Sequence, residues 1–153
     1  MIYPSILEAS YSYARLGWKI CFCEVGTTPT KTDLENATTK AEEIKQLYEK
    51  SSNPNIVIAT GKNSDLIAVK LPCDQVLKFF DTIYGKHVFS RFDDIPHKMI
   101  TPKDEVVGYF RYPMNKTVES KELNKGIYVY SDGGYVFAPP SRDEVGRRFE
   151  WIN

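Results

Sequence analysis

The sequence predicts an α+β fold, of the mixed α/β type, in which helices pack on a mixed sheet. Helical and strand patterns alternate over the first half of the chain, and short strand patterns dominate the second half. The composition is that of a globular protein, with 42% hydrophobic and 26% charged residues among 153. We expect a single domain over residues 1–153, since no repeat or shift in composition divides the chain.

The N-terminal segment predicts a helix followed by a buried strand. Apolar residues recur at helical spacing over residues 4–16, and Gly17 ends the pattern. The stretch WKICFCEV (18–25) is typical of a buried strand. Alternate strand residues face the same side, so we expect both Cys21 and Cys23 to point into a core.

A loop rich in Thr, Pro and Gly follows, over residues 26–38. The pattern T-x-x-E of Thr39 and Glu42 predicts a capping box that opens a second helix. The stretch SSNPN (51–55) ends this helix.

The middle of the chain predicts two short strands and a third helix. NIVIATG (55–61) and LIAVKL (66–71) are β-branched runs separated by KNSD, which indicates a hairpin-like connection. Apolar residues at helical spacing predict a helix over residues 73–84, with Asp74 near its start and Gly85 at its end.

The second half predicts mostly strands, separated by polar, Gly or Pro breaks. The expected strands are 98–102, 106–112, 126–131, 134–138 and 148–152.

Charge and targeting signals narrow the class of protein. The formal net charge is zero, which removes the argument for non-specific nucleic-acid binding through overall charge but allows a local basic face. The N-terminus lacks the pattern of a signal peptide, and no apolar run is long enough for a membrane span. We therefore expect a cytoplasmic protein that does not bind membranes.

No metal or cofactor site is indicated. The three cysteines are odd in number, and the two histidines, His87 and His97, are too far apart in sequence to complete a clustered ligand set. We expect neither a bound metal nor a cofactor.

The stretch SDGGYVFAPPS (131–141) predicts a glycine turn into a strand with a rigid exit. One interpretation is ordinary strand punctuation. The other is that the glycines let another group approach the backbone closely.

Five short motifs occur in an order that resembles a known family. They are YARLGWKI (13–20), ATTK (37–40), NIVIATGKNSDLIAV (55–69), TP (101–102) leading into GYFRY (108–112), and GGYVFAPPS (133–141). Together they resemble the bifunctional primase-polymerase domain of plasmid, phage and archaeal replication proteins, within the archaeo-eukaryotic primase superfamily. The resemblance runs from about residue 9 to the C-terminus.

The resemblance implies a catalytic site that this sequence lacks. Family members carry an acid-x-acid pair that binds two metals, a histidine that contacts nucleotide phosphate, and a third acid. The matching positions here are Lys70 and Pro72, then Val107, then Tyr128. We therefore expect no catalytic residues and no metal ligands at these positions.

A slip of one or two residues in this correspondence would change the assignment. It would bring Asp65 or Asp74 to the first pair and Asp132 to the third acid. Asp74 and Asp132 also fit ordinary cap and turn positions.

Several side chains are candidates for nucleic-acid binding. The candidates for phosphate contacts are Lys62, Lys70, Arg111 and Arg142, with Arg147 and Arg148. The candidates for base stacking are Tyr128 and Tyr130, which share one face of a strand, with Tyr109 and Tyr135.

The favoured function is a catalytically degenerate primase-polymerase-like accessory of DNA replication that binds nucleic acid, such as single-stranded DNA or a primer-template, or a replication partner. One alternative is a divergent but active DNA primase/polymerase. Another is an interaction or inhibitor protein carried by a mobile element such as a plasmid or virus.

Overall fold

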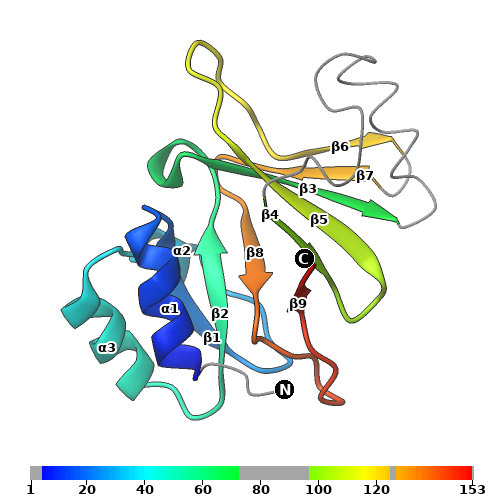
Figure 1. Ribbon diagram of the computed structural model, residues 1–153. Helices are drawn as coiled ribbons and strands as arrows, with labels where there is room; N and C mark the ends of the chain where they lie inside the picture. Colours follow the sequence, from blue (N-terminus) through cyan, green and yellow to red (C-terminus); the bar gives the residue numbers. More distant parts are fainter. Residues whose placement is uncertain (1–4, 73–96, 125–126, 153) are drawn as a thin grey trace.

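The computed structural model describes residues 5–72, 97–124 and 127–152 (Figure 1). These residues form two antiparallel sheets with helices on one of them, so the predicted α+β class is confirmed. The predicted helix over residues 73–84 lies outside the described residues.

The first sheet has three strands in the order β1-β2-β8. Its strands are β1 (Lys19–Glu24), β2 (Pro54–Ala59) and β8 (Tyr135–Ala138). The second sheet has six strands in the order β6-β7-β3-β5-β4-β9. Its strands are β3 (Leu66–Pro72), β4 (His97–Ile100), β5 (Glu105–Arg111), β6 (Lys121–Asn124), β7 (Ile127–Tyr130) and β9 (Glu150–Trp151).

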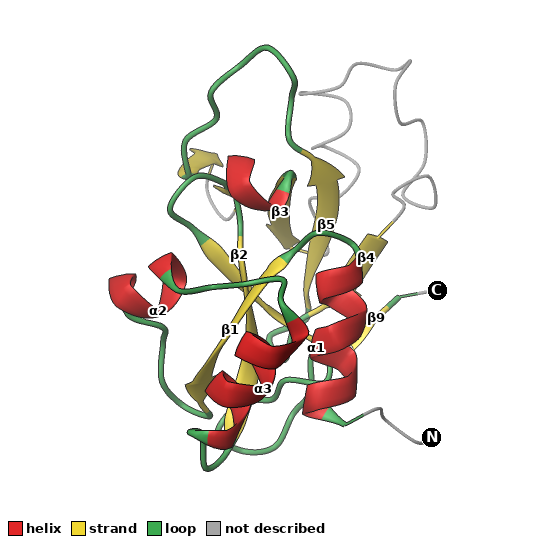
Figure 2. Ribbon diagram, turned by 90° about the vertical axis from the view of Figure 1, so that its left-hand side faces the viewer, coloured by secondary structure: helices red, strands yellow, loops and turns green. Residues whose placement is uncertain are grey.

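Helices α1 (Ile6–Arg15) and α3 (Ala41–Glu49) contact the first sheet and each other (Figure 2). The first helix is confirmed, and it begins with a capping box of Ser5 and Glu8. Gly17 follows it with a φ of 88°, a left-handed conformation that favours glycine.

Two local predictions on the way to the second helix are wrong. The N-cap of α3 is Lys40, without a side-chain cap, so Thr39 and Glu42 do not form the predicted capping box. The Lys40 amide donates to the hydroxyl of Thr38. A short helix, α2 (Lys31–Glu35), lies in the segment predicted as a loop. Its capping box is Thr30 with Asp33, a pattern present in the sequence.

The predicted hairpin-like connection between residues 55–61 and 66–71 is confirmed only at its turn, where Gly61 and Leu66 form one antiparallel bridge around KNSD. Both strands form, but β2 pairs with β1 and β8, whereas β3 pairs with β5 and β7. Between them the chain turns through a short 3-10 helix, η1 (Lys62–Ser64), flanked by positive φ angles at Gly61 and Asp65. The connection therefore carries the chain from one sheet to the other.

The strands predicted in the second half are confirmed in position, although the last one covers only Glu150–Trp151. Strand β6 was not predicted, because its sequence KELN is polar and lacks the β-branched pattern.

The main core lies where the helices and the two sheets meet. It joins residues of α1 and α3, such as Tyr13 and Ile44, with residues of both sheets, such as Ile58 and Val107. Cys21 and Cys23 are buried in a separate cluster on the first sheet, as predicted. This packing fixes how β3 and β5 of the second sheet stand against β8 of the first.

Candidate nucleic-acid cleft

One cross-strand row on the second sheet carries the positions singled out by the family resemblance. Lys70 of β3 lies opposite Val107 of β5 on one side and opposite Tyr128 of β7 on the other. Residues directly opposite in antiparallel strands share a face of the sheet. Three segments far apart in sequence thus bring Lys70, Val107 and Tyr128 together on one face. Pro72 stands two residues further along β3.

The centre of this row is a cation. The Lys70 ammonium lies 3.6 Å from a carboxylate oxygen of Glu105 and 6.0 Å from the ring centroid of Tyr130. Burial by itself lowers the pKa of Lys70, but Tyr130 and Glu105 outweigh it and hold the pKa above its ordinary value. Lys70 therefore stays protonated in a partly desolvated position.

An open pocket of about 300 Å³ surrounds Lys70. Strand β8, the middle of the GGYVFAPPS motif, supplies one wall through Tyr135, Val136 and Phe137. The second sheet and neighbouring loops supply the rest: Lys70, Met99, Thr101, Pro102, Lys103, Glu105, Val107, Tyr130, Asp143 and Phe149. The pocket is therefore a cleft between the two sheets with an aromatic wall.

The glycines of the motif serve the packing of the chain itself. A Cβ at Gly134 would lie 2.7 Å from the Ser120 hydroxyl and 2.9 Å from the Thr60 hydroxyl. Gly133 has a φ of 74°, which allows the turn into β8. The groups that approach the backbone here are neighbouring segments of the protein.

Asp132 and Asp65 would match the family's metal-binding acids if the alignment were shifted by one or two residues, but both carboxylates have structural partners. Asp132 accepts hydrogen bonds from the Lys62 amide and the Tyr112 hydroxyl. Asp65 pairs with Arg111 through two hydrogen bonds of 3.0 and 3.1 Å. Asp74 lies outside the described residues.

Asp143, which also lines the cleft, is held by its own loop. Its carboxylate accepts hydrogen bonds from the amides of Val145 and Arg147 and from the Arg147 side chain, and these lower its pKa against the opposing effect of desolvation. Within the described part of the chain, no three His, Cys, Asp or Glu side chains gather as a metal site would require.

The predicted binding residues fall into three places. Lys70 and Tyr130 line the cleft, and Tyr128 lies beside them, opposite Lys70 and with its ring centroid 4.7 Å from that of Tyr130. Lys62 and Arg111 lie near Asp65, at the opposite end of β3. Arg142 lies elsewhere, and its side chain donates to the amide oxygen of Asn53.

The stacking role suggested for Tyr109 is wrong, because its side chain is only 1% exposed. Its ring packs among Trp18 and Trp151 in the core. Tyr135 is half-buried and does line the cleft.

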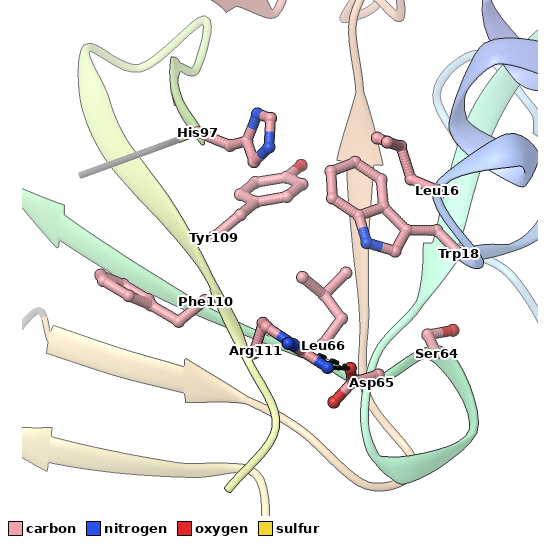
Figure 3. A pocket seen from close by; sticks show the side chains of 9 residues that line it. All are labelled: Leu16, Trp18, Ser64, Asp65, Leu66, His97, Tyr109, Phe110 and Arg111. Carbon is pink, nitrogen blue, oxygen red and sulfur yellow. Dashed lines mark hydrogen bonds and ion pairs between the residues drawn. The ribbon is translucent and has the colours of Figure 1, made fainter.

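A second open pocket lies near the Arg111 end of β3 (Figure 3). Its lining residues are Leu16, Trp18, Ser64, Asp65, Leu66, His97, Tyr109, Phe110 and Arg111. Sequence reasoning missed the contribution of Trp18 and His97 here, and that of Glu105 in the cleft. Strand pairing brings Glu105 to the cleft, and the packing of the two sheets brings Trp18 and His97 together, so no local motif could have shown them.

None of the helices in the described part of the chain has the length and apolar character needed to cross a membrane.

Comparison with known proteins gives a family match over most of the chain. A family model described as "Bifunctional DNA primase/polymerase, N-terminal" (Prim-Pol) matches residues 10–153. No curated protein matches the chain. The family match confirms the resemblance inferred from the five motifs.

Proposed function

The chain belongs to the bifunctional DNA primase/polymerase family, and from this premise we propose that it is a non-catalytic member that acts as an accessory of DNA replication by binding nucleic acid. The observation that carries the proposal is the position of Lys70. Its ammonium occupies the centre of the row where the resemblance expects metal-binding carboxylates.

The residues of this row do not fit a pair of divalent metals. Hard cations such as Mg²⁺ require several oxygen ligands, chiefly carboxylates. The row offers Lys70, Pro72, Val107 and Tyr128, and Glu105 at its rim is already paired with the Lys70 ammonium. A cation held at this point repels a metal ion. Metal-dependent nucleotidyl transfer at this site is therefore not part of the proposed function.

The same residues suit a phosphate group. A lysine ammonium has three N–H donors, and the Glu105 carboxylate, 3.6 Å away, attracts the Lys70 charge from just beyond hydrogen-bond distance. A donor of Lys70 can contact a phosphate oxygen, and Tyr128 and Tyr130 stand beside it on the same face. Phosphate contacts together with aromatic rings support the binding of a single strand or a primer-template.

We propose that residues 1–153 act as one unit, in the cytoplasm, with a replication protein as a second partner. The buried free thiols of Cys21 and Cys23 are compatible with a reducing compartment.

Fluorescence anisotropy with labelled single-stranded and primed DNA, over a salt series, tests this function. We expect binding that weakens with salt, with a log–log slope of about −0.7 for each phosphate contact on a single strand. Lys70→Gln should weaken binding and reduce the slope by about 0.7. Lys45→Gln is the matched control, since Lys45 lies on the exposed face of α3. Absence of binding at low salt would overturn the proposal.

A further inference from the structure

A continuous groove runs beside the C-terminal end of α1, away from Lys70. The pocket of Figure 3 and a neighbouring pocket share Leu16, Trp18 and His97. The neighbouring pocket adds Tyr13 and Trp151, together with Ser12, Lys98 and Ile152. We call the joined pockets the His97 groove.

Aromatic rings form the base of the His97 groove. The Trp18 ring contacts the rings of His97 and Tyr109 at centroid distances of 5.7 and 5.3 Å. The His97 ring also lies 6.4 Å from that of Trp151. His97 itself is exposed, and Leu16 on the Trp18 side of the pocket is 55% exposed (Figure 3). An accessible ring thus faces an accessible apolar side chain across the pocket.

Among the described residues, the cationic Arg111 and Lys98 and one acid, Asp65, line the His97 groove. The Arg111 side chain is 90% exposed at one end of the groove, where it pairs with Asp65. Its exposed guanidinium is the group that an anionic ligand would contact.

We propose that the His97 groove is a second subsite for single-stranded nucleic acid, in which a base stacks on the His97 ring and a phosphate contacts Arg111. This inference rests on the proposed nucleic-acid-binding function. Proteins that bind single strands combine a stacking ring with a cationic side chain. Such a site accepts any base, because every base has a π-face. A duplex keeps its base faces stacked inside, so the groove would accept single strands in preference to duplexes.

Intrinsic fluorescence reports directly on this site, because the chain has two tryptophans and both Trp18 and Trp151 line the groove. Titration with an unlabelled oligothymidylate should quench this fluorescence, with a midpoint equal to that from anisotropy. His97→Ala should weaken single-strand binding about tenfold. Arg111→Gln should reduce the salt slope by about 0.7. Lys45→Gln should change neither quantity, and near-ultraviolet circular dichroism checks that each variant is folded.

The outcomes separate this inference from the proposed function. If the wild-type protein binds no nucleic acid, the proposed function fails and the inference falls with it. If it binds without tryptophan quenching, and His97→Ala is without effect, only the His97 groove is refuted. If His97→Ala weakens binding and Lys70→Gln does not, the groove is supported and the Lys70 cleft is refuted.

Discussion

The ammonium of Lys70 lies 3.6 Å from the carboxylate of Glu105, on the face of the sheet that also carries Val107 and Tyr128. The two side chains are 29% and 24% exposed, so water screens their attraction only in part. The ion pair comes from β3 and β5 and closes one side of the cleft. The Glu105 charge offsets that of Lys70, so it limits how strongly Lys70 can attract a phosphate.

Glu105→Gln tests this relationship. The amide keeps the shape of Glu105 but removes the charge that competes with phosphate for Lys70. A partly exposed ion pair is worth about 1 kcal/mol, so single-strand affinity at low salt should rise about fivefold. Anisotropy titration measures the change, and Glu49→Gln on the exposed end of α3 is the control. Unchanged or weaker binding by the Glu105 variant would place the phosphate away from Lys70.

Gly134→Ala tests how the GGYVFAPPS motif is built. The new methyl would lie 2.7 Å from the half-buried Ser120 hydroxyl and 2.9 Å from the buried Thr60 hydroxyl. We expect the free energy of unfolding to fall by about 1–3 kcal/mol, as in other overpacked sites. Urea denaturation measures this.

Gly133→Asn is the matched control for Gly134→Ala. A Cβ at Gly133 has no neighbour within 4 Å, and asparagine tolerates the positive φ of 74°. Its cost should stay below about 1 kcal/mol. Equal losses from both substitutions would show that close packing at Gly134 is not the reason for the double glycine.

Stability should decline at alkaline pH through the Cys21 thiol. Burial raises the pKa of Cys21 from 9.0 to about 12, with smaller contributions from Asp33 and Cys23. As pH rises above 9, the unfolded chain releases the thiol proton while the folded chain keeps it. The free energy of unfolding then falls, by up to about 1.4 kcal/mol per pH unit.

Urea denaturation between about pH 8 and 9.5, where tyrosines with an ordinary pKa near 10 are still mostly protonated, measures this decline. Cys21→Ala should lower stability at every pH and reduce the dependence on pH, and Cys23, whose pKa burial also raises, contributes the remainder. A variant with the same slope as the wild type would rule out Cys21 as its source.

The sequence allowed the local elements to be predicted, but not the pairing of the strands. The helix at Ile6–Arg15 and the strand at Lys19–Glu24 follow from short-range patterns, and both are confirmed. The pairing of β2 with β3 does not extend beyond the bridge of Gly61 with Leu66, because the choice of partner depends on contacts far away in sequence. A β-branched run specifies a strand, but it does not specify the sheet that the strand joins.

The family motifs allowed part of the candidate site to be predicted from the sequence. The motifs singled out Lys70, Val107 and Tyr128, and strand register brings these three residues together. Glu105 and His97 gave no local signal. Glu105 reaches the cleft because it pairs with Pro72 across β3 and β5, and His97 meets Trp18 only through the packing of the two sheets.

Primer extension tests directly whether the protein is non-catalytic. The purified protein is incubated with a primed DNA template and deoxynucleotides, with Mg²⁺ or Mn²⁺, under conditions where anisotropy shows the template bound. We expect no incorporation with either metal, because Lys70 stands where the family resemblance implies a metal-binding acid. Metal-dependent extension that Asp65→Ala or Asp74→Ala abolishes would contradict this expectation and establish an active polymerase.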